Sequence, residues 1–252
     1  MDSLARFALA DDDGWTWLRG FPSGSADAVV IAPPGTADRH GQKGQAQPPG
    51  ALQNLAWDLG RVLAKGRRAL WICESKYGLG IARLLERFGL EVGAPIIWDR
   101  GEDVRGRLRW ILPVSHGRAR GLPSLPDLIV APGPSLGDAV AELLVMTSSL
   151  AGQWVLEPFA SQPTLALASI RLGRSWAGAS RSAEVRGAIA AASVAIGAKN
   201  AELPMRWDPS GVPVRAGSAL ASQLALTSEG EADGLGVRGS ATSEDEVRTG
   251  AL

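Results

Sequence analysis

Short apolar runs alternate along most of the chain with stretches in which apolar residues recur at helical spacing. The runs at residues 28–31 and 69–73 predict strands that are buried on both faces, because such strands are continuously apolar. The segments 52–65, 79–88 and 183–196 have amphipathic spacing and predict helices. This alternation indicates an α/β fold, with a mostly parallel sheet and helices on both faces.

Two further apolar runs predict an antiparallel element. Residues 92–98 and 108–114 are joined by a charged link that contains glycine, and they are expected to form a hairpin at one edge of the sheet. The main domain is expected over residues 21–200, after an N-terminal segment of residues 1–20. Acidic and small residues dominate after about residue 200, which predicts a disordered tail over 201–252.

The composition excludes several kinds of site and several classes of protein. The formal net charge is zero, so the overall charge does not favour tight, charge-driven binding to nucleic acid. Cys73 is the single cysteine, which excludes an intramolecular disulfide and, with only two histidines, a Cys/His zinc site. No signal-peptide pattern is visible, and no apolar stretch reaches the roughly 20 residues that span a bilayer. We therefore expect a soluble, cytoplasmic protein with no membrane association and no metal.

The order of four segments along the chain indicates a resemblance to a known family. The first ends in Ala32-Pro33-Pro34-Gly35, and the helix and strand of residues 59–73 follow it. The hairpin with its basic run at 115–120 comes next, and Val155-Leu156-Glu157-Pro158-Phe159-Ala160 comes last. Together they resemble the beta-class DNA N4-cytosine/N6-adenine methyltransferases, in which the catalytic half precedes the cofactor half. The resemblance covers about residues 20–197 and implies the Rossmann-like fold of class I methyltransferases.

The catalytic loop departs from the pattern of that family at both reactive positions. The family has Asp, Asn or Ser, then two prolines, then an aromatic residue; the polar residue accepts hydrogen bonds from the target amino group and the ring stacks on the extruded base. Here Ala32 has no polar side chain and Gly35 has no ring, whereas Pro33 and Pro34 are retained. The loop therefore predicts that no residue of this chain catalyses methyl transfer.

The cofactor half departs from the family in a similar way. The family's F-x-G-x-G loop lets the backbone approach S-adenosylmethionine closely, but Ala160-Ser161-Gln162-Pro163 follows Phe159 here. Ser180 follows the next strand, where the family has an acidic residue for the ribose hydroxyls. Glu157, Phe159, Ser161 and Ser180 are what remains of the implied pocket. We expect that S-adenosylmethionine binding is lost and that no other cofactor replaces it.

Arginines are concentrated in and around the predicted hairpin, with Trp98 and Trp110 interleaved. These arginines are candidates for contacts with a phosphate backbone, and the tryptophans for stacking on bases. In the alternative interpretation, the tryptophans face the core and the arginines form a solvated surface. The six candidates are Arg100, Arg105, Arg107, Arg109, Arg118 and Arg120.

The sequence thus predicts a catalytically inactive, methyltransferase-like protein that acts as a nucleic-acid-binding or protein-interaction subunit. The expected partners are DNA or RNA, an active methyltransferase, or a second copy of the chain in a homo-oligomer. Two alternatives stay open. One is an active transferase with a repurposed pocket, for DNA or another methyl acceptor, and the other is a structural component of a phage or mobile-element assembly.

Overall fold

The computed structural model describes residues 5–34, 50–102, 104, 107–119, 121–133 and 135–200, and the backbone of 205–207 and 213–215. Gly35, Arg105 and Arg120 lie outside these residues, as does most of the tail predicted over 201–252. Within the described part of the chain, no helix is both long and apolar enough to cross a membrane.

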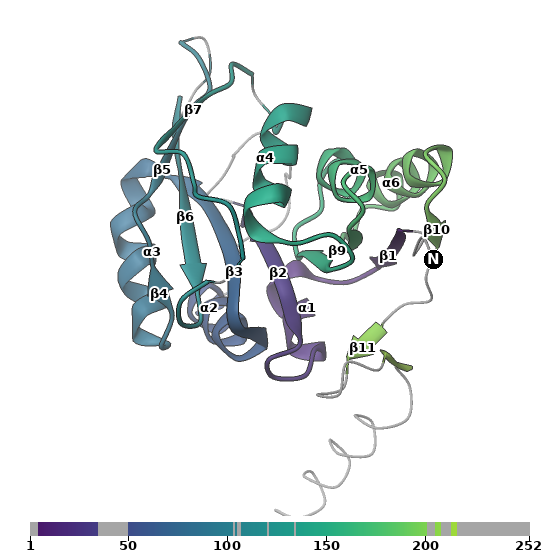
Figure 1. The fold of residues 1–252 in the computed structure, drawn as a ribbon, viewed down its shortest axis with the longest axis horizontal. Helices are drawn as coiled ribbons and strands as arrows, with labels where there is room; N and C mark the ends of the chain where they lie inside the picture. The colour runs from purple at the N-terminus through teal and green to yellow at the C-terminus, as the bar shows by residue number, and fades with distance from the viewer. Residues whose placement is uncertain are drawn as a thin grey trace, which may run out of the picture. The chain divides into compact units, whose positions relative to one another are not determined.

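A ten-stranded sheet runs through the fold in the order β10-β1-β9-β8-β2-β3-β6-β5-β7, with β4 paired to β6. Figure 1 shows the sheet passing from β10 and β1 on one side of the domain to β5 and β7 on the other. Two further strands, β11 (Met205–Trp207) and β12 (Pro213–Arg215), pair antiparallel with each other. The strands of the large sheet are β1 (Arg6–Ala10), β2 (Ala26–Ile31), β3 (Leu63–Glu74), β4 (Glu91–Val92), β5 (Ile96–Asp99), β6 (Leu108–Ser115), β7 (Leu128–Val130), β8 (Trp154–Glu157), β9 (Ser175–Ala179) and β10 (Lys199–Asn200).

Helices cover both faces of the sheet, and the sheet separates two apolar cores. Side chains of α1, α2 and α3 contribute to one core and those of α4, α5 and α6 to the other. Strand β2 supplies both cores from alternating positions, with Val29 in the first and Val30 in the second. The helices are α1 (Gly14–Trp17), continued by the 3-10 turn η1 (Leu18–Gly20), α2 (Ala51–Val62), α3 (Ser75–Arg87), α4 (Asp138–Ser148), α5 (Thr164–Arg171) and α6 (Ala183–Ala195).

The predicted sheet is confirmed, including its antiparallel element. Strands β5 and β6 form the expected hairpin, with Ile96 opposite Ile111 and Asp99 opposite Leu108. Strand β7 adds one parallel strand beyond the hairpin, so the hairpin is next to the edge of the sheet. The expected boundary at residue 20 needs correction, because β1 pairs with β9 and β10 inside the sheet. The first strand and helix are therefore part of the domain.

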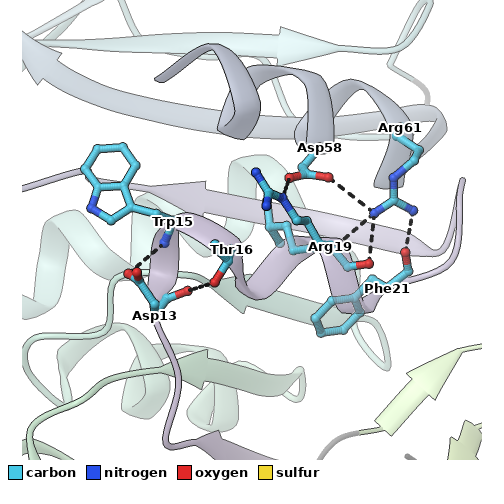
Figure 2. A network of polar contacts seen from close by, with 8 residues as sticks. Asp13, Trp15, Thr16, Arg19, Phe21, Asp58 and Arg61 are labelled. Atoms are coloured by element: carbon cyan, nitrogen blue, oxygen red, sulfur yellow. Dashed lines mark hydrogen bonds and ion pairs between the residues drawn. The ribbon is translucent and has the colours of Figure 1, made fainter. Parts of the chain in front are cut away.

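The buried carboxylate of Asp58 and the neighbouring Arg61 hold residues 18–21 against α2 (Figure 2). Asp58 on α2 accepts a hydrogen bond from Arg19 Nε at 3.2 Å and lies 3.5 Å from Arg61 Nη2. Arg61 in turn donates to the carbonyl oxygens of Phe21, at 2.5 Å, and Leu18, at 3.1 Å. These contacts anchor η1 and the α1 helix before it, and hence the orientation of the α1 side chains.

Candidate functional site

The carboxyl ends of four parallel strands meet at one edge of the sheet, which we call the carboxyl edge. Strands β1, β9, β8 and β2 are neighbours in this order, and each is parallel to the next. Ligands of open α/β sheets bind in the crevice outside such strand ends. The last residue of β8 and residues of the segments that leave these strands are the pocket and catalytic-loop residues implied by the resemblance: Glu157, and Ala32, Pro33, Pro34, Phe159, Ser161 and Ser180.

Helix α1 packs directly against the loop that follows β8. The rings of Trp15 and Phe159 meet edge to face, with centroids 4.9 Å apart. Asp13 caps α1 by accepting a hydrogen bond from the backbone N–H of Trp15 at 3.2 Å (Figure 2). A Cβ atom at Gly14 would lie 2.1 Å from the carbonyl oxygen of Pro158, so only glycine fits this approach. The tight contact leaves α1 packed against the loop that would face the cofactor.

The loop after β8 continues directly into α5. The backbone N–H of Ala160 donates to the carbonyl oxygen of Ala179 at 3.0 Å, which ties the loop to the end of β9. Ser161 and Pro163 stand at the two glycine positions of the family's loop. Ser161 is exposed, and Pro163 is the N-cap residue of α5 with a φ of −74°. This loop has the geometry of a strand-to-helix turn in which proline is well tolerated.

A tryptophan fills the space beside that turn. Trp176 on β9 is fully buried, and its ring lies against Gly178, where an added Cβ would be 2.3 Å from the indole. The same Cβ would lie 3.1 Å from the Cβ of Ala160. No motif of the sequence marks Trp176 as a site residue, because its role depends on the contacts that the fold gives its ring.

Glu157 is the last residue of β8, and its side chain contacts Trp176. Its Oε2 accepts a hydrogen bond from the indole N–H of Trp176 at 3.1 Å. Burial raises the pKa of Glu157 from its ordinary value of 4.5 to about 8, and the indole hydrogen bond opposes the rise only in part. The raised pKa favours the neutral form of this carboxyl group and disfavours a negative charge at the carboxyl edge.

Two ion pairs connect the end of β1 with the beginning of α6. Arg186 contacts both carboxylate oxygens of Asp11, at 2.8 and 2.9 Å, and also donates to the carbonyl oxygen of Ser180 at 2.7 Å. Arg181 donates to Asp13 at 3.2 Å. The hydroxyl of Ser180 accepts the backbone N–H of Ser182 at 3.3 Å. The polar groups that the strand ends bring together are thus engaged with one another.

The segment that the resemblance implies as the catalytic loop follows β2, and the structure describes it as far as Pro34. Ala32 is half-buried and contributes only a methyl group, and the buried Pro33 follows it. In the described residues no group of three or more His, Cys, Asp or Glu side chains could hold a metal ion.

The structure describes four of the six arginine candidates and places them in different environments. Arg100 and Arg109 are each only 2% exposed. Arg100 donates to the carbonyl oxygen of Gly133 at 3.2 Å, and Arg109 lies 3.9 Å from Glu74. Both side chains therefore support the hairpin from within and are not placed to contact a phosphate.

Of the remaining candidates, the structure describes Arg107 and Arg118. Arg107 makes two hydrogen bonds to Asp99, at 2.8 and 2.7 Å, and these lower the pKa of Asp99 to about 2. Arg118 is exposed, and Arg105 and Arg120 lie outside the described residues. Trp98 is buried, as the alternative interpretation of this region expected. Among the described arginine candidates, Arg100 and Arg109 are thus buried and Arg107 is paired with Asp99.

Comparisons with known proteins support the fold. No protein-family model matches the chain, and no curated protein matches its sequence. Among solved structures, a protein assigned as a DNA modification methylase from Thermus thermophilus, complexed with S-adenosyl-L-methionine, has a TM-score of 0.59 at 20% identity, over 79% of this chain and 100% of the other. M1.HpyAVI has a TM-score of 0.56 at 17% identity, over 74% and 98%.

A third structure extends the likeness to a cytosine-N4-specific enzyme. The PvuII DNA methyltransferase has a TM-score of 0.59 at 14% identity, over 75% of this chain and 86% of its own. The low identities limit the likeness to the arrangement of the backbone. The chain therefore has the Rossmann-like α/β fold of DNA methyltransferases, as the resemblance of its sequence implies.

Proposed function

We propose that this protein is a methyltransferase-fold subunit that binds nucleic acid and transfers no methyl group. The observation that carries the proposal is that the side chains of the carboxyl edge are engaged with each other. Trp15 packs on Phe159, Trp176 fills the space beside Gly178, and two arginines hold the carboxylates of Asp11 and Asp13.

The residues at this edge do not fit S-adenosylmethionine. The sulfonium of the cofactor is positively charged, and its ribose hydroxyls are held best by an anionic acceptor. Asp11 and Asp13 already hold Arg186 and Arg181, and burial raises the pKa of Glu157 to about 8, which disfavours a negative charge there. Ser180 offers a neutral hydroxyl that already accepts a backbone hydrogen bond. We therefore assign no reaction step to this cofactor.

The fold supports nucleic acid as the partner. Two of the structural neighbours named above are a DNA modification methylase and a DNA methyltransferase, so the shared backbone arrangement is one that acts on DNA in those proteins. A chain that keeps this fold while its catalytic loop has only Ala32 in place of a hydrogen-bonding side chain is suited to binding and not to methyl transfer.

A combined binding and transfer assay tests the proposed function. The full chain is titrated into labelled single-stranded and duplex oligonucleotides at about 50 mM and about 200 mM salt, and the same mixtures are supplied with radioactive S-adenosylmethionine. We expect binding that weakens at least about tenfold at the higher salt, because counterions are released from the phosphates. No methyl group should be incorporated. Incorporation above a boiled control would contradict inactivity, and no binding at the lower salt would contradict the binding role.

A further inference from the structure

Two arginines on α3 differ from most other cations of the described chain. Arg19, Arg61, Arg67, Arg107, Arg181 and Arg186 each pair with a carboxylate. Arg83 and Arg87 are both exposed, and neither forms an ion pair or a side-chain hydrogen bond with a described residue. They stand one helical turn apart, which places their Cβ atoms about 6 Å apart on the same side of α3. Two guanidinium groups are thus presented together to the solvent.

These arginines line a groove between α2 and α3. The groove has a volume of about 410 Å³, and the half-buried side chains of Leu52 and Leu84 form its apolar part. Gln53 adds the amide of an exposed side chain from the α2 side. None of the described residues that line the groove is acidic. The groove therefore favours an anionic ligand.

An exposed aromatic side chain stands next to this groove. Trp57 lies one turn beyond Gln53 on α2, and 58% of its surface is exposed. Its ring meets that of Phe88, the residue after Arg87, edge to face at 5.9 Å between centroids. An indole that is supported from one side and open on another can stack on a planar group.

We propose that the groove between α2 and α3 binds single-stranded nucleic acid, with phosphates on Arg83 and Arg87 and a base stacked on Trp57. Guanidinium groups bind phosphate oxygens in pairs, and exposed rings stack on any unpaired base. A duplex keeps its base faces covered, so the exposed indole favours a single strand. This inference rests on the proposed function, and it moves the binding surface from the predicted hairpin arginines to α2 and α3.

The test uses the full chain and a labelled oligo-thymidine, with binding measured by fluorescence polarisation over a series of salt concentrations. The double variant R83A/R87A should bind about tenfold more weakly, and the slope of log K against log salt should fall by about 1.4, because two phosphate contacts are lost. W57A should also weaken binding by about tenfold but should leave the slope unchanged, because stacking releases no counterions. All replaced side chains are exposed, so the variants should melt at the temperature of the wild type.

The control is the double variant R107A/R118A, which removes two hairpin arginines and should leave affinity and slope unchanged. If this control lost affinity while R83A/R87A did not, the groove would be excluded and the proposed function would stand. If the wild type bound no oligonucleotide at any salt concentration, both proposals would fail. Equal dependence on Trp57 for a duplex of the same length would overturn the assignment of a single-stranded ligand.

Discussion

Replacement of Trp176 by alanine is expected to lower the free energy of unfolding by about 4 kcal/mol, the usual cost of truncating a fully buried tryptophan. Trp176 is 0% exposed and packs against Gly178, and its indole N–H donates to Glu157. The variant would leave a cavity beside the loop after β8 and would remove the hydrogen-bond donor of a buried carboxyl group. Urea denaturation followed by circular dichroism measures the change.

Trp57→Ala is the matched control, because it removes the same side chain from an exposed position. Its free energy of unfolding should change by less than about 1 kcal/mol. A Trp176→Ala variant as stable as this control would show that the space beside the loop is not filled by packed side chains. The carboxyl edge would then be open to a ligand.

Glu157→Gln is expected to change how stability depends on pH. The pKa of Glu157 is about 8 in the folded chain and ordinarily 4.5, so the folded state holds a proton that the unfolded state releases. In the wild type this group's contribution to stability is therefore complete below about pH 4.5, falls as the pH rises to about 8, and is lost above that. The glutamine side chain cannot titrate, so the variant should lack this fall and should gain stability over the wild type as the pH increases.

Urea denaturation at about pH 5, 7 and 9 distinguishes the outcomes. Glu91→Gln, which changes an exposed carboxylate on β4, serves as the control and should follow the wild-type profile. Parallel profiles for Glu157→Gln and the wild type would mean that Glu157 is ionised in the folded chain. A negative charge would then be available at the end of β8.

The strands and long helices could be predicted because their burial leaves a pattern in the sequence. Strand β2 contributes to both cores, so residues 28–31 form a continuous apolar run. The hairpin follows from two apolar runs and a glycine-containing link. The sequence does not predict that β1 belongs to the domain, because its partners β9 and β10 lie about 170 and about 190 residues further along the chain. No local signal specifies that pairing.

The sequence predicts which side chains of the family pattern are absent from the candidate site. It does not predict the tertiary contacts that form there. Ala32, Ser161 and Pro163 can be compared with a family pattern position by position, so the sequence indicates the lost groups. The contacts of Asp11 with Arg186 and of Trp15 with Phe159 join distant segments, and only the fold brings them together. Arg109 was a candidate for phosphate contact because arginines are usually exposed, but its side chain is buried next to Glu74.

Calorimetric titration of the full chain with S-adenosylmethionine at neutral pH tests most directly whether the carboxyl edge has lost its cofactor. We expect no heat beyond that of dilution up to about 1 mM cofactor, since Asp11, Asp13 and Ser180 are engaged internally. A one-to-one binding isotherm with a dissociation constant of about 10 μM or less would contradict this expectation. The protein would then have to be regarded as a cofactor-binding methyltransferase.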